Sequence, residues 1–274
     1  MKALFCELKK IFVFLKKDLK LELSYKFSIL LRALSVILFC LVFFFLSRMV
    51  EGSSIKALSA YNGNYFSFAL IGMAFYSFFA VLLNSFSSRL RQEQLTGTLE
   101  AIFLTPVRLP TFLAGITSFS LSRGLANIFF FFLVGALLLG GKIYVSNIYL
   151  FTTVLLLSMA NFLSIGIIAS SFILVFKRGN PVNWLIENVF LLAGGVLYPV
   201  SVLPDWMQVF SRMLPLTYSL DALRSIMIPG ADTSAVSGQI TALGISLAVL
   251  FPLAALSFSK AVTETKRRGN LSQY

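Results

Sequence analysis

The sequence predicts an all-α integral membrane protein with six transmembrane helices, and three observations lead to that fold class. Hydrophobic residues make up 58% of the 274 residues and charged residues 12%, with a mean hydropathy of +0.87. Soluble domains average about 25% charged residues. Apolar runs of about 20 residues, the length that crosses a bilayer, recur along the chain. The 29 Phe residues exceed what a soluble core of this size can bury, so lipid is the expected solvent.

Residues 4–27 predict an amphipathic helix ahead of the first apolar run. At 100° per residue its apolar and basic side chains separate onto two faces: Leu8, Phe12, Leu15, Leu19 and Leu23 on one, and Lys10, Lys17 and Lys20 on the other. A basic helix of this kind lies along the inner headgroups. We therefore expect residues 1–28 to form a cytoplasmic N-terminal interfacial helix. Contact with a cytoplasmic partner is a second role open to it.

The six predicted spans occupy residues 29–260, with bounds 30–49, 66–87, 115–139, 149–176, 185–203 and 239–259. A cleaved signal peptide is the alternative for the first run, but its basic segment and apolar core are both longer than such peptides have. With the N-terminus in the cytoplasm, 17 of the 23 Lys and Arg residues lie inside. The positive-inside rule therefore predicts a multi-pass cell-membrane protein with both termini cytoplasmic, ending in a basic tail at 261–274.

The connection between the second and third spans is the longest one on the cytoplasmic side. Gly97 breaks the preceding helix, Thr98 is suited to cap a short helix that runs to Leu104, and Thr105-Pro106 ends it. A short helix parallel to the membrane would expose Glu93 and Glu100 as a docking surface. A plain polar loop is the alternative.

The connection before the sixth span predicts two short apolar helices separated by Pro215. Each is too short to cross the bilayer, which suggests a hairpin at about 204–230 that dips into the outer leaflet. A helix pair on the outer surface is the alternative. We expect labels at Ser211 or Ser219 to react from outside, and we expect four charged residues to mark the wet face: Asp205, Arg212, Asp221 and Arg224.

Two ionisable residues fall within the predicted spans, Arg123 in the third and Glu187 in the fifth. Intramembrane charges are functional candidates, although both lie near the cytoplasmic ends, where side chains snorkel to the interface. An ion pair between the two is one arrangement open to them.

Several kinds of chemistry are excluded by what the chain lacks. It has no His, which disfavours metal sites and Ser-His catalysis. The nearest approach to a phosphate-binding loop, Gly141-Lys142-Ile143, has no hydroxyl residue after the lysine, so this chain is not expected to hydrolyse ATP. The net charge of +12 is spread between apolar runs rather than interleaved with exposed aromatic rings, which argues against nucleic-acid binding.

Two stretches resemble signatures of ABC-2 type transporter permease subunits: Glu93–Pro106 (EQLTGTLEAIFLTP) and Gly194–Arg224 (GGVLYPVSVLPDWMQVFSRMLPLTYSLDALR). The predicted six spans, cytoplasmic termini and N-terminal surface helix also resemble the architecture of that family. The resemblance implies a coupling helix at about 93–106 that docks on a separate ATPase, with Glu93, Gly97, Thr98, Glu100, Thr105 and Pro106. It also implies short re-entrant helices before the last span, with Pro204, Trp206, Pro215, Tyr218, Asp221 and Arg224.

The resemblance further implies a transport subunit rather than an enzyme. Two permease chains, identical or different, would work with a dimer of cytoplasmic ABC ATPase subunits, exporting an amphipathic or hydrophobic cargo such as a drug, a lipid or a lipid-linked glycan. ATP and Mg would bind in the partner ATPase, so no cofactor is expected in this chain, and membrane lipids are its other partners. Two other functions remain open: an ion-coupled secondary transporter, and a non-transporting scaffold or lipid-modifying enzyme.

Overall fold

The computed structural model describes residues 12, 15–20, 22–50, 65–95, 109–141, 143–176, 181–228 and 236–267, and every regular element within these ranges is helical. The long helices are α2 (Lys26–Val50), α3 (Tyr65–Leu95), α5 (Leu109–Leu133), α6 (Ile148–Phe176) and α10 (Val236–Arg267). A π-helical turn, η2 (Val134–Leu138), continues α5. The short elements are α7 (Pro181–Ala193), the 3-10 turn η3 (Val200–Val202), α8 (Asp205–Ser211) and α9 (Pro215–Met227).

Among the described residues, five helices are long and apolar enough to cross a membrane. They are α2, α3, α5 with η2, α6 and α10, and each matches one of the spans predicted from the sequence, although α5 with η2 ends one residue before the predicted bound at 139. The all-helical membrane fold is therefore confirmed. The helices exceed the predicted bounds because polar residues at helix ends continue the backbone pattern beyond the apolar run; α10, for example, continues to Arg267.

The predicted span at 185–203 is not one continuous helix, and this part of the prediction is wrong. α7 begins earlier, at Pro181, and ends at Ala193. Its 13 residues rise about 20 Å, which is short of a hydrocarbon core of about 30 Å. Gly195 has a φ of +72°, a left-handed conformation that ends helices, and the following prolines prevent the helix from resuming. Hydropathy counts apolar residues and does not register this backbone break.

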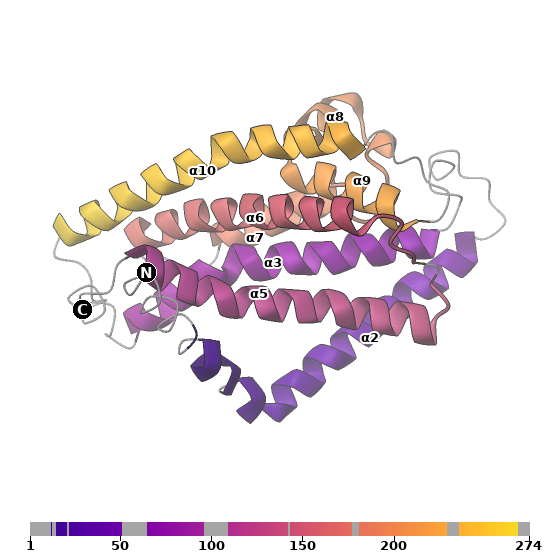
Figure 1. Ribbon diagram of the computed structural model, residues 1–274, viewed down its shortest axis with the longest axis horizontal. Helices are drawn as coiled ribbons and strands as arrows, with labels where there is room; N and C mark the ends of the chain where they lie inside the picture. Colours follow the sequence, from indigo (N-terminus) through magenta and orange to yellow (C-terminus); the bar gives the residue numbers. More distant parts are fainter. Residues whose placement is uncertain are drawn as a thin grey trace.

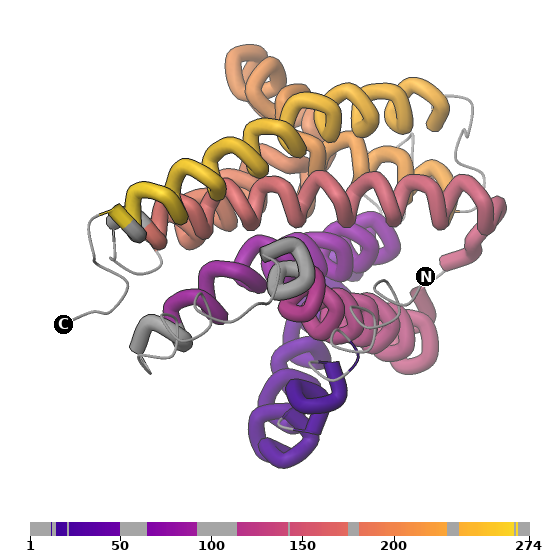
Figure 2. The backbone as a smooth tube through the Cα atoms, turned by 60° about the vertical axis from the view of Figure 1, so that its left-hand side comes forward, coloured from indigo at the N-terminus to yellow at the C-terminus, as the bar shows by residue number. Residues whose placement is uncertain are grey.

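α3 is the central helix of the bundle. In its most apolar window 78% of the residues are buried, against 6% for α2 and 11% for α10. α6 and α5 pack on opposite sides of α3, and α10 packs on the outside of α6 (Figures 1 and 2). The core is rich in aromatic rings, including Phe79, which stacks on Phe190 of α7 at 4.5 Å between centroids. α6 approaches α3 closely because Gly166 has no side chain. A Cβ at this position would lie 2.8 Å from the Leu82 carbonyl oxygen.

The helices alternate in direction, so their ends gather at two opposite ends of the bundle (Figure 1). We call the end where α3, α6 and α10 finish and α5 and α7 begin the basal end. The apical end is where α3, α6 and α10 begin, and α8 and α9 lie there (Figure 1). α2 runs obliquely and is set apart from α6 and α10 (Figure 2).

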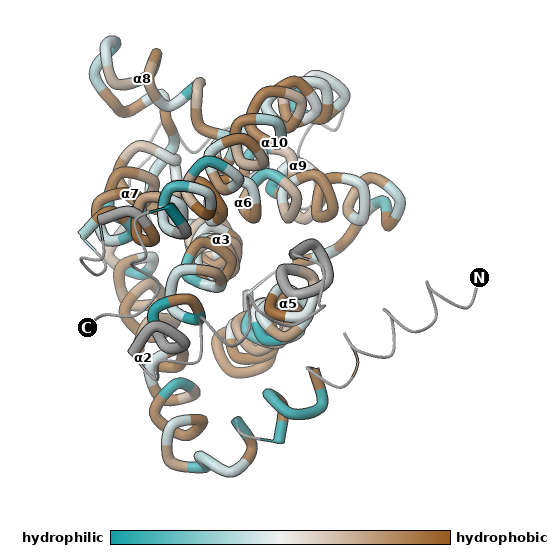
Figure 3. Tube along the Cα trace, turned by 90° about the vertical axis from the view of Figure 1, so that its left-hand side faces the viewer, coloured by the Kyte–Doolittle hydropathy of each residue, from teal (hydrophilic) through white to brown (hydrophobic). Residues whose placement is uncertain are grey.

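The outward surface of the long helices is apolar, as a membrane requires. The tube is mostly hydrophobic along the bundle, whereas the helical residues just before α2 are mainly hydrophilic (Figure 3). Large apolar side chains are exposed along both outer helices, among them Leu30, Leu38 and Phe45 of α2, and Ile245, Val249 and Phe251 of α10. Water does not tolerate an apolar surface this extensive, so lipid is its natural solvent.

Candidate functional site

The two helix ends that flank the predicted coupling segment, the end of α3 and the start of α5, lie at the basal end (Figure 1). Glu93 falls in the last turn of α3, where only the backbone is described, and α5 begins at Leu109. The other predicted coupling residues lie outside the described residues: Gly97, Thr98, Glu100, Thr105 and Pro106. The structure fixes both ends of this connection at the same end of the bundle, and its docking role stays a prediction.

The two short helices expected after Pro204 are present as α8 and α9 at the apical end. On α8, Trp206 is exposed, whereas almost all of α9 is buried. The turn between them is fixed by Thr217 Oγ1, which donates to the Ser211 carbonyl at 2.8 Å. Pro215 is the first residue of α9, a position where its missing N–H costs nothing.

α9 is bound to its neighbours by polar contacts as well as by apolar packing. Ser158 of α6 and Ser219 of α9 join their hydroxyls at 2.7 Å. The loop after η2 closes over the end of α9, where the backbone N–H groups of Tyr144 and Ser146 donate to the Met227 and Ile226 carbonyls at 3.0 and 3.1 Å. Ser211 and Ser219 are fully buried, so the expectation that labels would react there is wrong. Arg212 in the α8–α9 turn is exposed and is therefore a better position for a label.

Arg224 does not lie on a wet face with Asp205 and Arg212, and this part of the sequence interpretation is wrong. Its side chain is buried, with 1% of the residue exposed. The guanidinium lies over the Phe68 ring, 3.4 Å from the centroid, and Nη1 donates to the Gly195 carbonyl at 2.8 Å. Nη2 donates to the carbonyls of Val196 and Phe68 at 2.9 and 3.2 Å. Asp221 on the same helix is half-buried.

One side chain therefore ties three elements together, because Arg224 of α9 bonds both to α3 and to the segment that ends α7. Gly72 of α3 makes the space for it. A Cβ at position 72 would meet the Val196 carbonyl oxygen and Nη2 of Arg224. Sequence reasoning missed this arrangement, although a glycine one turn after Phe68 in an otherwise bulky helix was a signal for close backbone approach.

A second polar cluster lies between α3 and α7. Nδ2 of Asn84 donates to Oε1 of Glu187, and Nδ2 of Asn183 donates to Oδ1 of Asn84 at 2.8 Å. The Tyr76 hydroxyl lies 3.4 Å from the backbone carbonyl of Glu187. Glu187 and Arg123 line the same cavity of about 320 Å³. Within the part of the chain that the structure describes, no ion pair joins them.

Arg123 pairs instead with the N-terminal helical segment. Its Nε lies 3.7 Å from Oε1 of Glu22, which also binds Arg32 of α2. Asp18, one helical turn earlier, lies 3.6 Å from Arg89 of α3. Two carboxylates thus join three helices at the basal half of the bundle. The sequence carried a signal for this, because Asp18 and Glu22 are four residues apart and share one helix face.

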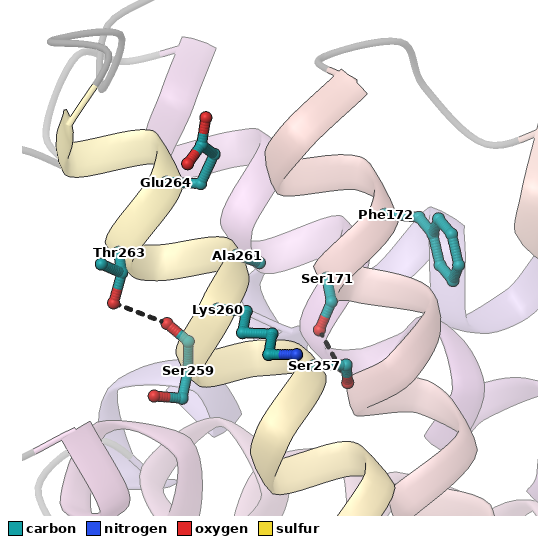
Figure 4. A pocket seen from close by; sticks show the side chains of 8 residues that line it. All are labelled: Ser171, Phe172, Ser257, Ser259, Lys260, Ala261, Thr263 and Glu264. Atoms are coloured by element: carbon teal, nitrogen blue, oxygen red, sulfur yellow. Dashed lines mark hydrogen bonds between the residues drawn. The ribbon is translucent and has the colours of Figure 1, made fainter.

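A groove of about 570 Å³ lies between α6 and α10 near the basal end (Figure 4). Four of the eight residues that line it carry hydroxyl groups, and Ser171 Oγ lies 3.4 Å from Ser257 Oγ. Both hydroxyls also donate to carbonyls of their own helices. Neither is paired with a general base in the described residues, and no acidic or cysteine cluster there is suited to hold a metal ion.

Comparison with known proteins bears on this arrangement. Residues 9–228 match the family of ABC-2 type transporters. No match was found among curated proteins. The matched range includes α2 to α9, and therefore the Arg224 cluster, the α3–α7 polar cluster and the connection between α3 and α5. The chain belongs to the ABC-2 type transporter family, as a membrane-embedded permease component of an ABC transporter.

Proposed function

We propose that this chain is the membrane-spanning half of an ATP-driven exporter that carries an amphipathic or hydrophobic cargo out of the cytoplasm. A separate pair of ABC ATPase subunits binds ATP and Mg and supplies the energy. Two permease chains form the pathway, and cargo passes along their interface. Family membership and the chain's lack of a phosphate-binding loop support this division of labour.

The observation that carries the proposal is the continuity of α3. This helix runs unbroken from Tyr65 to Leu95, about 46 Å by helical rise, and is the most buried long helix in the structure. Its basal end leads directly into the predicted coupling segment, and its apical end binds Arg224 through Phe68. A push on the coupling segment is therefore transmitted along one rigid helix to the segment where α7 ends and α9 packs.

The proposed topology places the basal end in the cytoplasm. Both termini, the coupling helix at about 93–106 and the basic tail then lie inside. α7 and the irregular chain after it form the fifth of six crossings, and α8 and α9 form a re-entrant hairpin at about 204–230. The buried carbonyls at 195 and 196 support this, because irregular backbone at membrane depth requires protein partners, and Arg224 supplies them.

The coupling assignment is tested by charge reversal of Glu93 and Glu100 together, in the complex reconstituted with its ATPase. We expect cargo transport to fall at least about tenfold while the protein still inserts. The docking carboxylates would become lysines, which an ATPase surface complementary to negative charge repels. The readout is transport per ATP hydrolysed. The matched control is Asp205→Lys on apical α8, which should transport normally; transport unchanged in the double variant contradicts the assignment.

An ion-coupled carrier is the second candidate, favoured by Glu187, a membrane carboxylate that lines a cavity. It requires that the permease alone, in liposomes under an ion gradient, moves its cargo and that Glu187→Gln stops it. We expect no cargo movement in that experiment until the ATPase and ATP are added.

A further inference from the structure

A connected, charged cavity lies at the basal half of the bundle, between the helical residues that precede α2 and the helices α2, α3 and α5. Its main chamber has a volume of about 440 Å³. The charged residues in its lining are Asp18, Glu22, Arg32, Arg89 and Arg123. Arg32 and Arg123 keep 35% and 39% of their side-chain surface accessible, so part of each side chain can be reached by a ligand.

Two further cavities adjoin this chamber and share lining residues with it. The cavity of about 320 Å³ beside Glu187 shares Arg123, Ser88 and Ser120 with it. A groove of about 360 Å³ between α2 and α5 shares Glu22, Arg32 and Arg123. Arg123 lines all three spaces and therefore stands at their junction.

The chamber holds more hydrogen-bond donors than acceptors. Each guanidinium offers five N–H groups, and the chamber contains three of them against two carboxylates. One of those carboxylates, Glu22, already serves both Arg32 and Arg123. Nε of Arg123 is buried and donates no hydrogen bond within the described part of the chain. In the adjoining cavity, the Glu187 carboxylate already accepts a hydrogen bond from Nδ2 of Asn84. An acceptor-only group, such as a phosphate, matches the donors that remain.

The groove supplies an apolar extension to this charged chamber. Apart from the charged residues at its mouth, most of its lining is apolar, including Leu23, Ala33, Val36, Ala126 and Phe130. Along α2 the lining passes from Arg32 to Val36, and along α5 from Arg123 to Phe130, so both helices lead from the arginines toward the apical end and into the bilayer. Charge at one end and apolar walls at the other match an amphiphile, with its headgroup at the arginines and its chain between α2 and α5.

We propose that this composite cavity binds a phosphate-bearing amphiphile of the leaflet at the basal end, which is the inner leaflet in the proposed topology. Arg32, Arg89 and Arg123 bind the phosphate, and the α2–α5 groove holds an acyl chain. The site lies within one chain and needs neither nucleotide nor ATPase. Its binding is therefore measured without transport, and failure of the site leaves the proposed export function standing.

The test uses the full chain in detergent with an equimolar mixture of dioleoyl phosphatidylglycerol and dioleoyl phosphatidylcholine, and bound lipid is counted by native mass spectrometry. Wild type is expected to retain the anionic lipid about tenfold over the zwitterionic one: both carry a phosphate, but choline neutralises it in phosphatidylcholine, whereas the net negative charge of phosphatidylglycerol is left to pair with the arginines. The double variant Arg32→Gln/Arg123→Gln should lose this preference. The control, Arg212→Gln/Arg267→Gln, removes two exposed arginines outside the cavity and should keep it.

A second variant tests the groove without touching any charge. Ala126 is exposed and lines the groove, so Ala126→Trp fills it with little risk to folding. This variant should lose dioleoyl phosphatidylglycerol. Inorganic phosphate at millimolar concentration should not displace the lipid from wild type. Equal lipid retention in wild type and the double arginine variant overturns the proposal. Displacement by inorganic phosphate, with full lipid binding in Ala126→Trp, also overturns it and reassigns the chamber to a free anion.

Discussion

Arg224 acts as a cap for a helix to which it does not belong. The last carbonyls of a helix and those just beyond it have no partner within that helix, and in lipid they have no water either. Arg224 reaches from α9 to the Gly195 and Val196 carbonyls and to α3 at Phe68. The planar guanidinium suits this task, because it directs several donors in fixed directions and stacks on a ring.

Replacing Arg224 by Lys tests this role while keeping the charge. An ammonium is a compact point charge and cannot reach three carbonyls and stack on Phe68 together. We expect a loss of about 2 kcal/mol, since buried acceptors are left unsatisfied. In a thermal melt of the detergent-purified protein this corresponds to a fall in Tm of roughly 5 °C. Arg212→Lys, at an exposed position, should melt like wild type, and equal melting of both variants would refute the capping role.

Gly72→Ala tests the space that the Arg224 side chain needs. The added Cβ would meet the Val196 carbonyl and the guanidinium, so α3 and the end of α7 must separate. We expect a destabilisation of about 1–3 kcal/mol from this overpacking, seen as a lower Tm. Gly244→Ala in α10 is the matched control, because a Cβ there meets nothing within 4 Å. A Gly72→Ala protein as stable as the control would show that the contact relaxes freely.

At the scale of elements, α3 and α7 are joined by the Asn84–Glu187 contact. Asn84→Asp places a second carboxylate beside Glu187. We expect like-charge repulsion and the lost donor to lower the free energy of unfolding by about 1–2 kcal/mol, seen as a lower Tm. Adding Glu187→Gln restores a donor opposite the new acceptor, so the double variant should regain most of the loss. If the double variant melts no higher than Asn84→Asp alone, the contact does not join the helices.

Apolar length and charge asymmetry are enough to predict most of the elements. α2, α3, α6 and α10 each follow an apolar run with few ionisable residues, and the helix pair α8–α9 follows from Pro204 and Pro215. α7 was predicted too long, because GGVLYPV is as apolar as a span. α7 ends where Gly195 adopts a positive φ. This break is tolerated because the Gly195 and Val196 carbonyls accept hydrogen bonds from Arg224, a distant residue.

The candidate site was less predictable than the helices, for a physical reason. Arg224, read alone, belongs on a polar surface, since burying an unpaired cation is costly. Its burial becomes favourable only when Phe68, Gly195 and Val196 arrive from two other elements. The role of Asp18 and Glu22 likewise depends on arginines from α2, α3 and α5. Local hydrophobic periodicity does not predict contacts between distant parts of a chain.

At the scale of the whole molecule, the alternation of helix directions gives a prediction about sidedness. In a background with both native cysteines replaced, Arg212→Cys in the α8–α9 turn should react with a membrane-impermeant maleimide on intact cells. Arg267→Cys at the end of α10 should react only after permeabilisation, because the α8–α9 turn and the end of α10 lie at opposite ends of the bundle (Figure 1). Both residues are exposed, so reactivity reports sidedness rather than burial. The reverse pattern would invert the topology.

The sparse packing of α2 has a mechanical consequence. Helices in lipid gain little from hiding apolar surface, since the surrounding chains are equally apolar, and their association depends on close packing and polar contacts. Little of α2 is closely packed, with 6% of its window buried, and one of its charged contacts, Arg32 with Glu22, lies near its N-terminal end. We therefore expect α2 to change its tilt more easily than the other long helices, which would widen or narrow the groove between α2 and α5 while α3, α5, α6 and α10 keep their core packing.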